Sequence, residues 1–168
     1  AGLGGAVLSV VIPGLARGFC AGAVPFYDRS VPLVAARVRD IVRASEMNGS
    51  PLLPRRGAPL RTVVPGWYGM TSVKWLSHIT VVDQPFEGHH QRHSYRFRTT
   101  PDEEGTPMSR ILPRALMTPP GIPDFYTRQR FVAAGVCRLQ GRAWSGWDSI
   151  SGVQVSVDGG TSWSEADI

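Results

Sequence analysis

Residues 57–76 read GAPLRTVVPGWYGMTSVKWL and place one arginine and one lysine, Arg61 and Lys74, on either side of a Pro-Gly-x-x-Gly turn. The β-branched residues before the turn predict a short strand, which the Pro-Gly pair stops. Arginine offers a planar fork of donors, and lysine offers a compact point charge. Two cations held by a rigid turn suit a phosphate or another oxyanion. The stretch therefore predicts an anion site in which both charged ends lie in one phosphate-sized pocket.

The composition is typical of a globular protein. The chain has 168 residues, of which 42% are hydrophobic, enough for a packed core in one domain or two small ones. The formal net charge is +5, and the arginines are scattered along the chain. Binding of nucleic acid needs a clustered basic stripe or a known module. The sequence shows neither, so we expect no nucleic-acid partner.

The chain begins with an apolar run, residues 1–16. The run is shorter than the roughly 20 residues that a membrane-spanning helix needs, so we expect no spanning segment. A signal peptide is disfavoured because no basic residue precedes the run and Arg17 follows it. We expect these residues to be core sequence. Because the chain starts with Ala1 and stops at Ile168 in a strand-like region, we expect it to be a piece of a longer protein.

Turn signals and periodicity organise the first part of the chain. Apolar residues at helical spacing predict a helix over residues 33–43, with a strand over residues 40–46 as the alternative. Asn48-Gly49 is a strong signal for a tight turn. Residues 73–82 read as extended and apolar. Residues 99–105 have the composition of a linker, so we place a domain boundary there, between residues 1–100 and 101–168.

The sequence pattern of the second part is typical of a β-sandwich. Residues 111–118 and 131–139 look like strands. Alternation with period 2 puts three valines on one buried face, namely Val153, Val155 and Val157. Short strands with turn signals at this spacing are typical of a sandwich. The predicted fold class is α+β and mainly β.

The stretch at residues 57–76 closely resembles the molybdopterin-binding domain of the sulfite oxidase family. Residues 46–52, EMNGSPL, resemble the hairpin that precedes the family's cofactor-binding turn. GRAWSG at residues 141–146 and VQVSVDGGTSW at residues 153–163 resemble its immunoglobulin-like dimerisation domain. The resemblance runs from about Tyr27 to the end of the chain. It implies part of a molybdopterin domain followed by an incomplete immunoglobulin-like β-sandwich.

The resemblance gives a role to four residues. Arg61 and Lys74 match the arginine and lysine that contact the pyranopterin cofactor and its phosphate. Arg56 stands where many members have a histidine that also contacts the cofactor. Tyr95 matches the tyrosine that points at the molybdenum site and the substrate oxyanion, and it is the catalytic candidate.

The cysteines do not complete a metal site. In the family, molybdenum is bound by a thiolate in a Cys-x-Gly-Asn-x-Arg segment well upstream of the hairpin. Cys20 lacks the Asn and Arg and lies too close to Met47, so we expect a small buried hydrophobe there. Cys137 is expected to be structural, and a single disulfide between Cys20 and Cys137 is an alternative that the sequence leaves open.

The histidines do not predict a metal site either. His89, His90 and His93 crowd one loop, and His78 lies nearby in the sequence. Metal sites need convergent ligands of defined number. The loop has no accompanying cysteine, and its acids are not spaced as a motif. We therefore expect no metal ligands among the residues of this chain.

The resemblance implies an oxidoreductase of the sulfite oxidase type with a molybdenum-molybdopterin cofactor. In such enzymes an oxo group moves from molybdenum to the sulfur of sulfite, and two electrons reduce the metal. The family also contains nitrate and sulfoxide reductases, and the residues retained here do not separate these substrates. The implied partners are a small anionic substrate and, in the full-length protein, a second copy through the β-sandwich. We expect the isolated chain to be inactive.

Two alternatives stay open at this point. One is a non-catalytic remnant that keeps a cofactor half-site and a dimerisation module. The other is a plain β-sandwich binding module to which the first part of the chain is an appendage.

Overall fold

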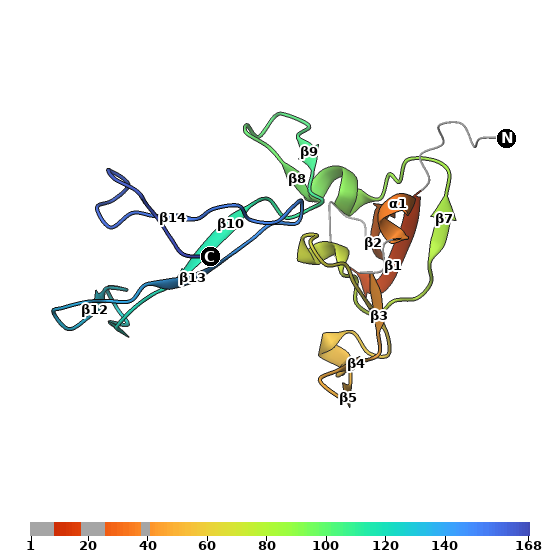
Figure 1. Ribbon diagram of the computed structural model, residues 1–168. Coiled ribbons are helices and arrows are strands. Elements are labelled where there is room, and N and C mark those ends of the chain that lie inside the picture. Colours follow the sequence, from red (N-terminus) through yellow and green to blue (C-terminus); the bar gives the residue numbers. More distant parts are fainter. Residues whose placement is uncertain (1–8, 18–25, 38–40) are drawn as a thin grey trace. The chain divides into compact units, whose positions relative to one another are not determined.

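The computed structural model describes residues 9–17, 26–37 and 41–168, and its elements are mainly short β-strands (Figure 1). The chain divides into two units, residues 1–110 and 111–168. None of the described residues belongs to a helix long and apolar enough to cross a membrane.

The first unit is built around a three-stranded antiparallel sheet. Strand β1 (Ser9–Arg17) lies between β2 (Phe26–Pro32) and β7 (Thr80–Val82). The β1–β2 register pairs Val10 with Val31 and Ile12 with Arg29.

The hydrophobic core of this unit consists of β-branched side chains that alternate along these strands and the following segments. Its buried members are Val10, Ile12, Val31, Val64 and Val73. The expectation that the N-terminal apolar run is core sequence is therefore confirmed for its described part, where residues 10–12 are buried.

The predicted helix is much shorter than expected. Helix α1 (Leu33–Ala36) has four residues, and residues 38–40 lie outside the described part. Strand β3 (Val42–Ala44) then pairs with β6 (Arg61–Val63), so the extended alternative describes this segment better. A strand partner is available to Val42, and β-branched residues favour pairing over the end of a helix.

The turn signals are confirmed. Asn48 and Gly49 both have positive φ, 53° and 75°, and join β4 (Glu46–Met47) to β5 (Ser50–Pro51) as a tight hairpin. Of the extended stretch predicted at residues 73–82, only β7 is a strand. The earlier residues of that stretch instead lie against the turn that forms the candidate site.

Three short helical turns and one hairpin complete the unit. The turns are η1 (Pro54–Arg56), η2 (Gly69–Thr71) and the π-helical η3 (His90–Ser94). Strands β8 (Arg96–Phe97) and β9 (Thr106–Pro107) form the hairpin. The linker-like residues 99–105 are the loop of this hairpin, and the division between the units falls after it. The assignment of the two parts to the family's domains stays a prediction.

The second unit consists of three separate antiparallel strand pairs. They are β10 (Arg114–Thr118) with β13 (Gln140–Trp144), β11 (Ile122–Pro123) with β12 (Arg130–Phe131), and β14 (Gln154–Val155) with β15 (Ser164–Glu165). Throughout residues 111–168, all of which the structure describes, no residue is buried. The immunoglobulin-like sandwich therefore stays a prediction for this part.

Two local predictions for the second unit are wrong. The strand expected over residues 131–139 ends at Phe131, and the next strand begins at Gln140. Of the three valines predicted to be buried, Val153 and Val155 are only half-buried. Val157 is 85% exposed, because strand β14 ends at Val155 and a polar turn follows. In that turn the Asp158 carboxylate accepts hydrogen bonds from the backbone N–H groups of residues 161 and 162, which takes the chain out of the pleat.

Candidate functional site

Gly57 closes the turn that carries the predicted anion site. Its φ of 107° is in the left-handed region, and its N–H donates to Pro54 O at 3.0 Å. A Cβ on Gly57 would lie 2.9 Å from the Cβ of Lys74. Glycine is therefore required both for the backbone conformation and for the close approach of Lys74.

The segment that contains Lys74 is pressed against β1 at a second glycine. A Cβ on Gly14 would lie 2.5 Å from Lys74 O, and Gly14 is bridged to Leu76. On the side away from β1, Trp75 fastens the segment to turn η1, because its Nε1 donates a hydrogen bond to Pro54 O at 2.9 Å. Trp75 has a φ of 51°, which costs a non-glycine residue backbone strain. The position of Lys74 is thus fixed by its neighbours on both sides.

Arg61 and Lys74 converge on adjacent carbonyls of turn η1. Arg61 Nη1 donates to Arg56 O at 3.1 Å, and Lys74 Nζ donates to Arg55 O at 3.0 Å. The two charged ends therefore meet on one face of the chain, 13 positions apart in the sequence. Arg61 Nη2 also donates to Ser72 O at 3.2 Å. That a phosphate-sized pocket lies between the two cations stays a prediction.

We call this group of four positive side chains, Arg55, Arg56, Arg61 and Lys74, the cationic turn. The Arg56 side chain is exposed, and the structure shows its role only through its carbonyl. In the described part of the chain, the ion pairs are Arg92–Glu87 and Arg96–Glu104, so no carboxylate neutralises the cationic turn. Arg61 Nε is buried and has no hydrogen-bond partner. This donor set fits an anionic phosphate-bearing cofactor of the kind that the resemblance implies.

Tyr95 lies at a second place in the same unit, between η3 and β8. Its N–H donates to His90 O at 3.0 Å, and its carbonyl accepts from Met108 N at 3.0 Å. The first bond caps the π-helix, and the second ties the residue to the segment after β9. Tyr95 is therefore held from both sides by backbone hydrogen bonds.

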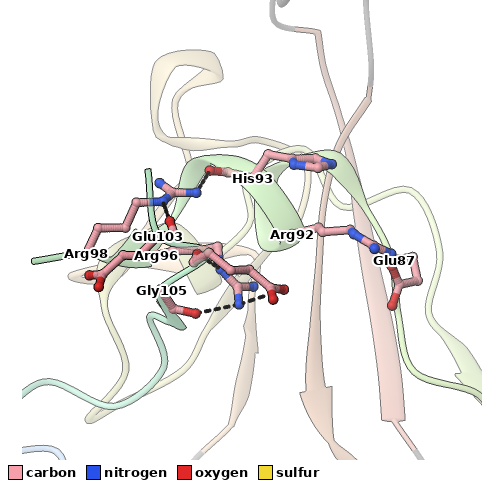
Figure 2. Close-up of polar contacts among 8 residues, drawn as sticks. Glu87, Arg92, His93, Arg96, Arg98, Glu103 and Gly105 are labelled. Atoms are coloured by element: carbon pink, nitrogen blue, oxygen red, sulfur yellow. Dashed lines mark hydrogen bonds and ion pairs between the residues drawn. The ribbon is translucent and has the colours of Figure 1, made fainter. Parts of the chain in front are cut away.

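Two arginines, Arg96 and Arg98, fasten the loop of the β8–β9 hairpin (Figure 2). Arg98 Nη2 donates to His93 O at 2.9 Å, and its Nε donates to Glu103 O at 3.0 Å. Arg96 Nη2 donates to Gly105 O at 2.6 Å. These bonds join the hairpin loop to η3, so both arginines are structural and are not free to bind a ligand.

The ring of Tyr95 is surrounded by other rings and one cation. Its centroid lies 6.4 Å from that of Tyr27 and 6.2 Å from that of His90. Burial raises the pKa of the Tyr27 phenol, and the adjacent Tyr95 adds to the increase, so Tyr27 stays protonated and donates to Met70 O at 2.8 Å. Burial lowers the pKa of His90, which favours the neutral imidazole.

The cation in this group is Arg29, which the sequence analysis did not select. It is only 2% exposed, and its Cζ lies 5.2 Å from the centroid of the Tyr95 ring. Burial lowers the pKa of its guanidinium, which nonetheless stays charged at neutral pH. A signal for it exists in the sequence, because Tyr27, Arg29 and Val31 alternate on one face of β2.

A cleft of about 190 Å³ opens next to Arg29. Its walls come from β2, from the segment after β6, from η3 and from the segment after β9, with Ser30, Trp67, Gln91, Met108 and Ser109 among its lining residues. Arg29 is the charged residue in its lining. The structure thus places Arg29 in the lining of a small cleft and against the ring of Tyr95, while the cationic turn is a separate feature.

The described histidines and Cys137 are not placed together as metal ligands. His89 and His93 have ring centroids 5.2 Å apart, but the described residues contain no group of three or more His, Cys, Asp or Glu side chains placed to hold a metal ion. Cys137 is a free thiol and is exposed rather than packed in a core. Cys20 lies outside the described residues, so its predicted role and its possible bridge are not tested.

A family model described as an oxidoreductase molybdopterin binding domain matches residues 4–90. Mitochondrial sulfite oxidase of Mus musculus is 34% identical over 148 residues, which cover 84% of this chain and 27% of that protein. An NADH nitrate reductase of Brassica napus is 30% identical over 143 residues, which cover 77% of this chain and 16% of that protein. The chain therefore spans about a quarter of the length of the sulfite oxidase.

A solved structure has a similar fold. The crystal structure of the sulfane dehydrogenase SoxCD from Paracoccus pantotrophus superposes with a TM-score of 0.68 at 28% sequence identity. The match covers 95% of this chain and 38% of that chain.

Proposed function

This chain belongs to the family of oxidoreductases with a molybdopterin-binding domain, and from that premise we propose that it forms part of an oxo-transfer enzyme of the sulfite oxidase type. The observation that carries the proposal is the cationic turn, in which Arg61 and Lys74 meet on one short turn with no carboxylate among the described residues to neutralise them. The proposed substrate is a small oxyanion such as sulfite.

The predicted family, the mainly β sulfite-oxidase-type fold and the molybdenum-molybdopterin cofactor are confirmed by these comparisons. Nitrate reductases match as well, so the choice of sulfite belongs to the proposal. It is supported by the longer match of the sulfite oxidase, over 84% of this chain against 77% for the nitrate reductase.

The residues of the cationic turn would hold the cofactor. Arg61 and Lys74 would donate to its phosphate, exchanging their present bonds to backbone carbonyls for stronger charge-assisted ones. The exposed side chain of Arg56 would add a third donor. When bound, the cofactor supplies the redox chemistry of oxo transfer.

Tyr95 would orient the substrate. Its fixed backbone and the closely packed rings of Tyr27 and His90 leave the phenol little freedom. A phenol O–H that is held in place donates a hydrogen bond to an oxyanion at little entropic cost. We also propose that the full-length protein forms a homodimer through its second unit.

The cofactor-binding role is tested by expressing the 168-residue chain in a host that makes the cofactor and measuring molybdenum and pterin in the purified protein. We expect Arg61→Gln and Lys74→Gln each to lower the pterin content several-fold. Arg138→Gln, a matched loss of charge at an exposed arginine of the second unit, should leave it unchanged. Equal pterin content in all four proteins would contradict the proposal.

The same preparation tests for catalysis. We expect no oxidation of sulfite by the isolated chain, because Cys20 lacks the motif that surrounds the family's thiolate. Turnover that disappears in Cys20→Ser would make Cys20 the metal ligand and would overturn this expectation.

A further inference from the structure

Arg29 is a buried cation without an acceptor for most of its donors. Its Nε and Nη1 are buried and have no hydrogen-bond partner, and its Nη2 reaches Met108 O only at 3.5 Å. Buried polar groups are nearly always hydrogen-bonded, and a buried charge is normally paired. An unpaired arginine in a core therefore requires an explanation.

No carboxylate supplies the missing partner. The ion pairs of the described residues do not include Arg29. Its neighbour Asp28 forms no ion pair with Arg29, although its charge works against the lowering of the Arg29 pKa by burial. Burial raises the pKa of Asp28, and the nearby charges of His90 and Arg29 act in the opposite direction. The ring of Tyr95 offers only a partial negative face.

The cleft next to Arg29 is small and has both polar and apolar walls. Gln91 Nε2 donates to Ser30 Oγ at 2.8 Å, and Ser30 N donates to Gln91 Oε1 at 3.0 Å, so this wall is rigid. Trp67 forms an apolar wall. The volume of about 190 Å³ is below the roughly 300–1,000 Å³ typical of sites for drug-sized ligands. The cleft thus has room for a small anion and little more.

We propose that Arg29 is a substrate-binding residue, whose guanidinium group binds a small oxyanion in this cleft. The proposal rests on the proposed function for the identity of the anion as the substrate. It adds to that function a cation that does not belong to the cationic turn. Arginine suits this role because it keeps its charge when buried and offers several donors to one oxyanion.

The test is direct binding of anions to the 168-residue chain, with sulfite and nitrate as probes at constant ionic strength. Trp67 lies in the wall of the cleft, so tryptophan fluorescence reports occupancy, and calorimetry gives the dissociation constant. We expect saturable binding of sulfite to the unmodified chain and at least ten-fold weaker binding to Arg29→Gln. Arg29→Lys keeps the charge and should be intermediate. Arg138→Gln should bind like the unmodified chain.

Three results would overturn the proposal. The first is that the unmodified chain shows no saturable binding of sulfite, and the second is that Arg29→Gln binds sulfite as tightly as the unmodified chain. The third is that Arg138→Gln loses as much affinity as Arg29→Gln, which would indicate a general effect of charge. Nitrate binding that depends on Arg29 in the same way as sulfite binding would support a general site for small oxyanions at Arg29.

A melting experiment separates binding from folding. Arg29→Met replaces an unpaired buried cation by an apolar side chain of similar length, so in anion-free buffer it should melt no lower than the unmodified chain. It should also lose the increase in melting temperature that sulfite gives the unmodified chain. A clearly lower melting temperature without anion would mean that the guanidinium has partners inside the protein, and the proposal would be wrong.

The cofactor content of the same variants separates this inference from the proposed function. Arg29→Gln should retain as much pterin as the unmodified chain, whereas Lys74→Gln should not. If neither the unmodified chain nor any variant retains pterin, but anion binding still depends on Arg29, the proposed function is wrong and the anion site is supported. If pterin is retained and anion binding is absent, only the anion site fails.

Discussion

The two units are stabilised in different ways. In residues 1–110, side chains far apart in the sequence meet around a buried core, as Tyr27 and Met70 do, or Arg29 and Met108. In residues 111–168 most side-chain hydrogen bonds join residues within four positions of each other, and no residue of this fully described unit is buried. Long-range packing can fix the position of a functional group relative to distant segments, whereas the hydrogen bonds of a local turn fix only the residues of that turn. The candidate site accordingly lies in the first unit, and its variants should have the larger effects.

The largest effect is expected from Gly57→Ala. The left-handed backbone alone costs a non-glycine residue about 1–3 kcal/mol. The new Cβ would also lie 2.9 Å from the Cβ of Lys74, which other contacts hold in place. We expect a clear loss of stability in chemical denaturation and loss of pterin retention.

Gly49→Ala is the matched control for this change. Gly49 also has positive φ, 75°, but a Cβ there would meet nothing within 4 Å. Its cost should be only the backbone term, about 1 kcal/mol, with pterin retention unchanged. Equal effects of the two substitutions would mean that the close approach of Lys74 to the turn has no importance.

A smaller and more selective effect is expected from Tyr95→Phe. The ring contacts to Tyr27 and Arg29 remain, so the melting temperature should change little. In the cofactor-loaded full-length protein, loss of the donor to the oxyanion should lower kcat/KM for sulfite about ten-fold or more.

Tyr27→Phe should behave in the opposite way. It loses the bond to Met70 O, which joins two distant segments, and should lower stability by about 1 kcal/mol. Its effect on kcat/KM should be much smaller than that of Tyr95→Phe. The reverse order would move the catalytic role from Tyr95 to Tyr27.

The sequence predicts features that depend on local chemistry and on a long motif. The Asn48-Gly49 hairpin follows from backbone preferences alone, and the convergence of Arg61 and Lys74 follows from the glycine-containing turn between them. The helix predicted over residues 33–43 fails because pairing of β3 with the distant β6 outweighs the helical spacing.

Arg29 shows the other limit of sequence reasoning. An arginine is normally a surface residue, and only the packing of β2 against the segments of Tyr95 and Met108 makes it a buried cation. Tertiary packing also explains why Val157 is exposed. Alternation predicts which side chains share a face of a strand, but it does not predict whether another segment covers that face.

The smallest effect is expected in the second unit, at the turn around Asp158. Hydrogen bonds from Ser162, and then from Ser156, lower the pKa of this carboxyl group below its ordinary value. Because the folded-state pKa is the lower one, the stabilisation of the turn is present above the ordinary aspartate pKa of about 3.9 and is lost as the pH falls through the folded-state pKa. The amide resonances of Gly160 and Thr161 in NMR spectra should therefore stay constant from neutral pH down to about pH 4 and shift only in stronger acid. In Asp158→Asn they should show no such titration, and the equivalent turn at Asp124, whose carboxylate accepts from Thr127, should be unaffected. A shift of the Asp124 turn in this variant, or a fall in pterin retention, would contradict the view that the second unit is held by local contacts that act independently.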